Sequence, residues 1–162
     1  MISTTVDFSV RPALQADVER MAAIWYEAAE ALAKADPCVR LAPNAIAVWR
    51  AATEQCLSLP NMAHFVAVNE QQTVIAYIIG ECVANAPAFL PERYGLVRDL
   101  AIDHHAKSGR MSSALLTALR AWFAEQGITE LQVRVPYHHP VAQAFWRALG
   151  ARKIADQFWL KL

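Results

Sequence analysis

The chain has 162 residues, of which 56% are hydrophobic, and its 15 basic side chains equal its 15 acidic ones. A chain of this length is expected to form one domain, residues 1–162, whose core needs no metal or disulfide to hold it. The balanced charge excludes a strong overall field for nucleic acid or an anionic membrane, so we expect neither as a partner.

Nothing in the sequence predicts a membrane span or a signal peptide. No apolar run approaches the roughly 20 residues of a span, and residues 1–7 lack the basic and long apolar regions of a secretory signal. Cys38, Cys56 and Cys82 are odd in number, far apart and in apolar surroundings, which predicts reduced thiols in the core. We therefore expect a soluble cytoplasmic protein.

The first half of the chain predicts a strand, two helices and a hairpin. Residues 8–11 form the strand, and apolar side chains at helical spacing predict a helix over about 15–34. A second helix opens at Pro43-Asn44, with Asn44 as its N-cap, and Pro60-Asn61 closes it. Residues 64–68 and 73–82 are the two strands of a hairpin around the polar turn 69–72.

The second half predicts three more strands and two more helices. After an irregular loop over 84–93 comes a strand over 96–102 and then a helix with an apolar face from Met111 to Phe123. Gly127 is placed for a left-handed helix end. A strand over 131–135, a helix over 141–149 ended by Gly150, and a terminal strand over 157–162 follow. The order β-α-α-β-β-β-α-β-α-β predicts an α/β or α+β domain around a mixed sheet.

The segment between the strand 96–102 and the next helix is typical of a phosphate-binding turn. It reads Lys107-Ser108-Gly109-Arg110-Met111-Ser112. The first backbone N–H groups of a helix are unpaired, and its dipole places partial positive charge there. The alternative is a strand-to-helix turn whose basic side chains are only solvated.

The element order and two sequence motifs resemble the GNAT superfamily of acyl-CoA-dependent N-acetyltransferases over essentially the whole chain. The family's cofactor motif is a strand ending in an aliphatic residue, Arg/Gln-x-x-Gly-x-Gly/Ala five positions later, and a helix with a Leu-Leu pair. Here Ile102 ends the strand, Lys107 falls five positions later and Leu115-Leu116 is the pair. The second motif, Asn-x-x-Ala-x-x-Phe-Tyr-x-x-x-Gly-Phe, is similar to residues 139–151, and Val10-Arg11-Pro12-Ala13 with Asp17 is similar to the family's first strand and helix start.

The chain departs from these motifs at several positions. Lys107 replaces Arg or Gln, Arg110 the first Gly and Ser112 the second Gly or Ala, while His139 replaces Asn and Trp146 replaces Tyr. Glycine lets the backbone approach phosphates closely. Arg110 therefore either closes the site or turns outward and supplies charge to the phosphates.

The resemblance implies a place for acetyl-CoA as co-substrate. In the family the strands that correspond to 96–102 and 131–135 splay apart, pantetheine pairs with the backbone of the first, and the N–H groups of the following loop hold the pyrophosphate. No metal is expected. The residues expected at the cofactor are Leu100, Ala101, Ile102, Lys107, Ser108, Gly109, Arg110, Met111, Ser112, Ser113, His139 and Trp146.

Acetyl transfer to an amine needs a base, a donor for the oxyanion and an acid for the departing thiolate. Asp99 is the first candidate base and Glu81 the second, and a backbone N–H near Leu100 or Ala101 is the expected oxyanion donor. An indole N–H cannot act as an acid, so Tyr137 is the candidate acid in place of Trp146. A thiol pKa of about 8.5 also means that the leaving group needs little help. Each carboxylate can instead be a solvated or salt-bridged strand end.

Two histidine pairs are outside the family pattern. His104-His105 follow one splayed strand and His138-His139 the other. Adjacent side chains of an extended chain point in opposite directions, so at most one ring of each pair is expected to face a shared site. Metal binding needs more ligands, and only Asp103 is near in sequence. His139 is the best candidate for a phosphate-contacting or pH-sensitive imidazole, and solvated loop side chains are the alternative.

The sequence thus favours an N-acyltransferase that moves acetyl or a similar acyl group from CoA to a primary amine of a small molecule. The alternative is a catalytically silent domain of the same fold that acts as a CoA sensor or interaction module, which Arg110, Ser112 and Trp146 favour. Acetylation of peptide N-termini is a third reading, although nothing marks a peptide groove. The apolar terminal segment favours a homodimer.

Overall fold

A five-stranded mixed sheet forms the centre of the computed structural model, which describes residues 7–106 and 110–162. The strands lie in chain order and are β1 (Phe8–Pro12), β2 (Met62–Asn69), β3 (Val74–Ala84), β4 (Arg93–Ile102) and β5 (Leu131–Val133). The first three pairings are antiparallel, and β4 pairs with β5 in parallel. This confirms the predicted mixed sheet.

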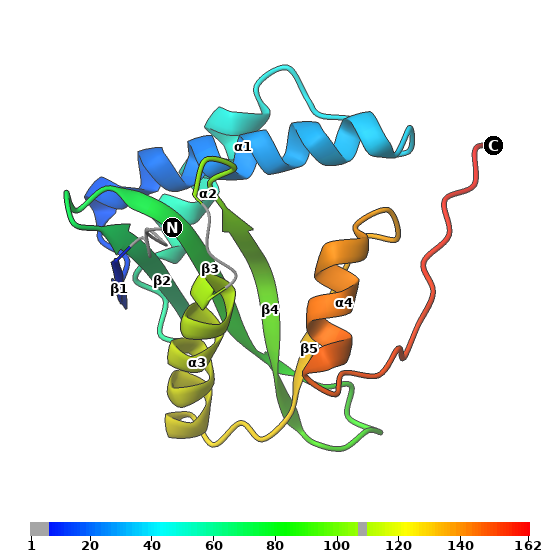
Figure 1. Ribbon diagram of the computed structural model, residues 1–162. Coiled ribbons are helices and arrows are strands. Elements are labelled where there is room, and N and C mark those ends of the chain that lie inside the picture. Colours follow the sequence, from blue (N-terminus) through cyan, green and yellow to red (C-terminus); the bar gives the residue numbers. More distant parts are fainter. Residues whose placement is uncertain (1–6, 107–109) are drawn as a thin grey trace.

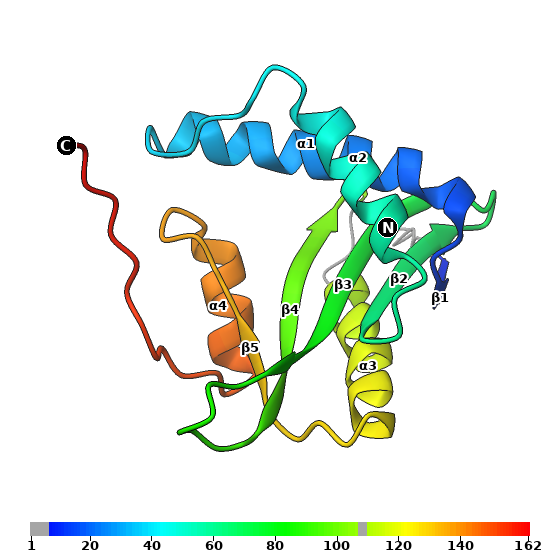
Figure 2. The same ribbon diagram turned by 180° about the vertical axis from the view of Figure 1, so that it is seen from behind.

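Helices cover both faces of the sheet. A 3-10 turn η1 (Gln15–Asp17) leads into α1 (Val18–Ala35), which packs with α2 (Ala45–Cys56) on one face. The opposite face carries α3 (Arg110–Glu125) and α4 (Pro140–Ala148). Figures 1 and 2 show these three layers from the two sides. All four predicted helices are present, although α1 begins three residues later than expected, after η1, and α2 ends at Cys56, before the expected stop at Pro60-Asn61.

The alternation of side chains along the strands creates two separate apolar cores. Ala76 and Ile78 of β3 contact the core under α3, whereas Tyr77 and Ile79 contact the core under α1. Small residues let α3 lie close to the sheet, since a Cβ built on Gly95 would stand 2.7 Å from the Phe123 ring. Successive strand residues therefore point alternately to the α3 side and to the α1 side of the sheet.

An ion pair fixes the start of α1 against β1. The guanidinium of Arg11 donates to both carboxylate oxygens of Asp17, at 2.6 and 3.0 Å, and the backbone N–H of Leu14 donates to the same carboxylate at 2.7 Å. These hydrogen bonds, led by that from Arg11, hold the pKa of Asp17 below its usual value. The two residues singled out at the first strand and helix start are thus direct partners.

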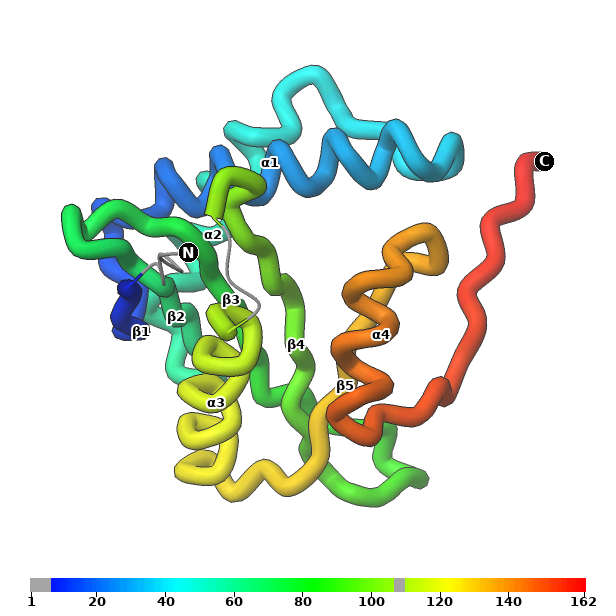
Figure 3. Tube along the Cα trace, viewed as in Figure 1, coloured from blue at the N-terminus to red at the C-terminus, as the bar shows by residue number. Residues whose placement is uncertain are grey.

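The terminal strand predicted over 157–162 is absent. Residues 151–162 contain neither helix nor strand, and in Figure 3 this segment runs as an extended chain outside α4. Phe158 is 89% exposed and Trp159 69% exposed. The apolar pattern predicts a strand, but a strand also needs a hydrogen-bonding neighbour, and these residues have none within the described part of the chain.

One smaller expectation is wrong, and another is confirmed only in its position. Cys38 is exposed and only Cys82 is buried, although all three cysteines are free thiols. Asn44 does stand at the N-cap of α2, but its side chain makes no capping hydrogen bond. Gly127 and Gly150 do end their helices, with φ of +72° and +88°. None of the described helices is long and apolar enough to cross a membrane.

Substituting Gly95 with alanine should destabilise the fold. The added Cβ would overlap the ring of Phe123, which is 2% exposed and has no room to move. We expect a loss of about 1–3 kcal/mol in the free energy of unfolding, measured with urea. The added substitution Phe123→Leu removes the clash, so the double variant should lose less than the sum of the single variants. Additive losses would contradict this account.

Candidate functional site

The two parallel strands, β4 and β5, separate after a short paired stretch. β4 pairs with β5 only through Gly95, Leu96 and Val97, which face residues 131–133. The remainder of β4, from Arg98 to Ile102, keeps β3 on one side but has no strand neighbour on the other within the described residues. Figure 1 shows β4 and β5 diverging from this point. The expected splay is therefore present, and it leaves one edge of β4 available along Leu100, Ala101 and Ile102.

A β-bulge in β4 lies at the point of divergence. Asp99 faces Ile79 and Val97 faces Gly80, so Arg98 is one extra residue in the β4 strand. The bulge bends the strand locally. The Arg98 side chain turns to Glu81, with 3.2 Å between guanidinium nitrogen and carboxylate oxygen. Glu81, the second candidate base, is thus paired in the way that the structural alternative predicted.

Asp99 is held by donors on several sides. The hydroxyl of Tyr77 donates to its carboxylate at 2.7 Å, and the Trp49 indole and the Leu100 backbone N–H also donate. Burial raises the pKa of Asp99 above its usual value, while these hydrogen bonds act in the opposite direction. Burial also raises the pKa of Tyr77 well above its usual value, so its hydroxyl remains a donor. Asp99 is therefore a positioned carboxyl group with increased affinity for a proton.

A cavity of about 340 Å³ opens beside Asp99, between the sheet and the α1–α2 layer. Trp25 of α1 and Trp49 of α2 line it, together with His64 of β2 and Asp99. Trp25 and Trp49 stack with ring centroids 5.5 Å apart and planes 16° apart. Trp49 also meets Tyr77, with 5.6 Å between centroids. Trp25 and Trp49 therefore both pack against neighbouring rings and line the cavity.

His64 is a lining residue that the sequence reasoning missed. It is 6% exposed, and its Nδ1 is buried with no hydrogen-bond partner among the described residues. Desolvation lowers its pKa, so the ring is neutral near neutral pH. The available signal was a polar residue in an apolar strand. The alternation of β2 sets which face His64 occupies, but only the fold shows that Asp99 shares this face.

The start of α3 has some of the features of a phosphate-binding site. α3 begins at Arg110, whose side chain is exposed together with that of Ser113. Ser112 is half-buried, and the Met111 side chain is fully buried under the sheet. The first-turn N–H groups of a helix of 16 residues suit an anion. Lys107, Ser108 and Gly109 lie outside the described residues.

The expected residues beyond β5 have varied surroundings. Tyr137 is 81% exposed and its ring meets His138 edge-on at 5.1 Å. His139 is the N-cap of α4, where its Nδ1 accepts the Ala142 backbone N–H at 3.2 Å. Trp146 is 6% exposed and belongs to the core under α3. His139 and Trp146 thus each have a structural role that needs no cofactor.

The histidines after β4 do not behave as an extended pair. They lie in a turn, which brings the rings of His104 and His105 to 3.6 Å between centroids, against the expectation that they point apart. Ligand atoms of both rings and of Asp103 lie within 4.8 Å of one another. However, Asp103 is ion-paired with Arg20, and His104 Nδ1 lies 2.7 Å from Glu27. Asp103 and His104 thus each have a partner within the protein.

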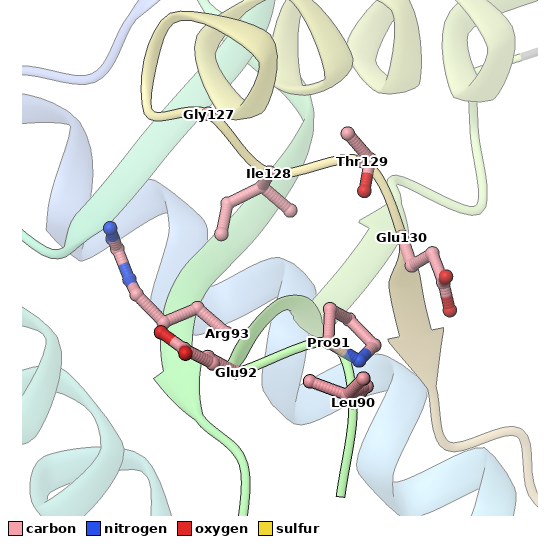
Figure 4. Close-up of a pocket in the computed structure, with 8 residues that line it drawn as sticks. All are labelled: Leu90, Pro91, Glu92, Arg93, Gly127, Ile128, Thr129 and Glu130. Atoms are coloured by element: carbon pink, nitrogen blue, oxygen red, sulfur yellow. The ribbon is translucent and has the colours of Figure 1, made fainter.

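A larger cavity of about 590 Å³ lies at the far end of β4 from Ile102. Figure 4 shows Leu90, Pro91, Glu92 and Arg93 on one side of it and residues 127–130, between α3 and β5, on the other. None of the predicted site residues lines it. The smaller cavity is the better candidate site, because it contains Asp99 and adjoins the point where β4 and β5 separate.

Solved structures share this fold. A variant of the BH1408 protein of Bacillus halodurans is 19% identical, with a TM-score of 0.81 over 95% of this chain and 99% of that one. Aminoglycoside 6'-N-acetyltransferase AAC(6')-Ih of Acinetobacter baumannii is 12% identical, with a TM-score of 0.74 over 96% and 98%. Aminoglycoside N-acetyltransferase AAC(6')-Iy, solved with CoA, is 12% identical, with a TM-score of 0.74 over 100% and 99%.

A family comparison assigns the chain. No curated protein matches it. The model of the acetyltransferase (GNAT) family, however, matches residues 24–151, which is most of the chain and runs from α1 past the end of α4. The match includes both splayed strands and the cavity beside Asp99. The chain therefore belongs to the GNAT acetyltransferase family, whose members use acetyl-CoA.

Proposed function

We propose that this chain transfers an acetyl group from acetyl-CoA to the primary amine of a small molecule. The observation that carries the proposal is the placement of Asp99, a half-buried and hydrogen-bonded carboxyl group, in a cavity at the bulge where β4 leaves β5. Aminoglycoside acetyltransferases of the same fold, which act on small molecules, support the choice of acceptor class.

In this proposal the free edge of β4 and the start of α3 hold acetyl-CoA, which supplies the activated acetyl group. Backbone groups of Leu100, Ala101 and Ile102 pair with the amides of the pantetheine arm. N–H groups of residues 108–113 hold the pyrophosphate, with Lys107 and Arg110 adding positive charge. His139 and Trp146, at α4, complete the predicted cofactor wall. The exposed side chain of Arg110 favours the charge-supplying reading over the closed-site reading.

Asp99 is the proposed base. A carboxyl group with a raised pKa accepts a proton from an ammonium ion more readily than an ordinary one. A backbone N–H near Leu100 or Ala101 would donate to the oxygen that gains negative charge during transfer. Tyr137, which is exposed, is the proposed acid for the thiolate. Glu81 is a weaker candidate base because Arg98 already neutralises it.

Three free cysteines suit a reducing compartment, so we place the reaction in the cytoplasm.

The silent-domain alternative keeps one supporting observation, namely that buried Trp146 occupies the position where the family often has a tyrosine hydroxyl. Acetyl-CoA binding without turnover on any amine would favour it. Peptide N-termini stay a third acceptor class, separable from small amines in the same assay.

We also propose a homodimer formed by residues 151–162. The segment carries exposed Phe158, Trp159 and Leu160, and exposed apolar side chains in a row favour association. β5 is an edge strand with β4 as its single neighbour in the sheet, so it can accept a further strand. The proposed occupant of this edge is the terminal segment of a second copy.

Acetyl-CoA should bind the native protein with a Kd in the micromolar range. Calorimetric titration checks this. Arg110→Glu should weaken binding about tenfold at low salt, and less at high salt, because an exposed charge is screened. Arg120→Glu, also exposed but farther along α3, is the matched control and should change the Kd little. Failure of the native chain to bind would overturn the cofactor site, and tighter binding by Arg110→Gly would restore the closed-site reading.

Asp99→Asn should lower kcat/KM for acetyl transfer by about 10²–10⁴ and leave acetyl-CoA affinity nearly unchanged. Tyr77→Phe tests the assignment through pH. Asp99 must be ionised to act as base, so activity falls as pH drops through its pKa. Removing the Tyr77 hydroxyl raises that pKa further, and the acidic limb of the kcat/KM profile should move to higher pH. A comparable loss in Glu81→Gln with full activity in Asp99→Asn would reverse the assignment.

Light scattering after gel filtration should show a dimer for the native chain. Phe158→Asp combined with Trp159→Asp places two charges in the proposed contact and should give a monomer with unchanged far-UV circular dichroism. Lys161→Asp is the control for added charge, and we expect it to leave the dimer intact. A native monomer at about 100 μM would rule out this contact.

A further inference from the structure

The cavity beside Asp99 has an aromatic wall formed by Trp25 and Trp49, whose stacked rings have centroids 5.5 Å apart. Tyr77 is fully buried and packs behind the inner end of this wall, with its ring centroid 5.6 Å from that of Trp49. Trp49 and Tyr77 both donate hydrogen bonds to Asp99. The polar atoms at the inner end of the wall are therefore used to orient one carboxyl group, while the ring surfaces of Trp25 and Trp49 remain partly exposed beside the cavity.

The charges of the lining suit one cation and no more. Among the described residues that line the cavity, Asp99 is the single carboxylate. His64 is neutral because burial lowers its pKa. Arg98, also in the lining, carries positive charge and is paired with Glu81 at 3.2 Å. A second ammonium group in the cavity would lose water without gaining a counter-charge, which is costly.

Part of the remaining surface is apolar, Thr53 adds a hydroxyl group to it, and the space is small. Met62 and Ile79 contribute aliphatic groups from the sheet, and Ala52 contributes a methyl group from α2. A volume of about 340 Å³ is near the lower limit of ordinary small-molecule pockets. Flat rings gain stacking energy on indole faces beyond the burial of their area, and ammonium groups are attracted by such faces. Shape and surface together favour a compact, flat ligand.

We propose that the acceptor is a compact primary amine with a single positive charge and a flat apolar body, which lies along Trp25 and Trp49 with its nitrogen at Asp99. Polycationic acceptors such as polyamines and aminoglycosides are excluded by the same lining. The claim that this amine accepts the acetyl group rests on the proposed acetyl transfer. The claim that the cavity binds this class of amine does not depend on it. The experiments below separate the two.

The kinetic test uses acetyl-CoA with matched acceptors and follows free thiol. 2-Phenylethylamine should give kcat/KM about fivefold to tenfold above 2-cyclohexylethylamine, which has the same charge and length but no flat ring. Spermidine and kanamycin should be at least about tenfold poorer than either. Trp25→Leu should bring the ratio of the two monoamines close to one. Trp122→Leu, on the opposite face of the sheet, is the matched control and should preserve the ratio.

Equilibrium binding decides the proposal without turnover. Quenching of tryptophan fluorescence gives the Kd of each amine, and Trp25→Leu should weaken 2-phenylethylamine more than 2-cyclohexylethylamine. Equal affinities for the two monoamines, tighter binding of spermidine, or no binding of either monoamine would overturn the proposal. Efficient acetylation of polycations alone would also overturn it but leave acetyl transfer standing. Selective binding without thiol release would support the recognition proposed here and contradict the transferase function.

Discussion

The parallel pairing between β4 and β5 ends at Val97 and Val133, and the rest of the site depends on this short contact. Had the pairing continued, β5 would occupy the edge of β4 from Arg98 to Ile102, and those backbone groups would be satisfied within the sheet. Instead the edge is available for an extended ligand with amide groups. At the same point the bulge at Arg98 changes the register against β3, so the backbone opening and the oriented carboxyl group of Asp99 arise together.

Strand alternation then separates the two halves of the proposed reaction. Leu100 and Ile102 pack on the α3 side of β4, whereas Ala101 packs on the α1 side, where Asp99 also lies. A co-substrate held at the start of α3 and an acceptor held under α1 would approach one strand from different sides. The two bound molecules therefore need not compete for space, and the strand between them positions the atoms that react.

The sequence predicted the elements well because helical and strand periods are local properties. It predicted α1, α2 and α3 and singled out Asp99 as a candidate base, but it did not place Trp25, Trp49 and His64 around one cavity. That placement depends on which face of the sheet α1 and α2 cover, which is a tertiary property. Residues 157–162 show the opposite error, since β-like composition does not make a strand without a partner. The turn at His104 and His105 likewise follows from Asp103, which accepts the His105 backbone N–H at 2.9 Å.

Burial of Asp99 has an energetic consequence that links the cavity to its ligand. Because its pKa in the folded state is raised, the protonated form of Asp99 favours folding and its ionised form opposes it. The stability that the protonated carboxyl group contributes is therefore lost as pH rises through that pKa. The donors Tyr77, Trp49 and Leu100 offset part of the loss. A bound ammonium ion would supply the missing counter-charge, so ligand binding and stability are coupled at one carboxyl group. The site is thus least favourable when empty and ionised, which is the state that a cationic acceptor would relieve.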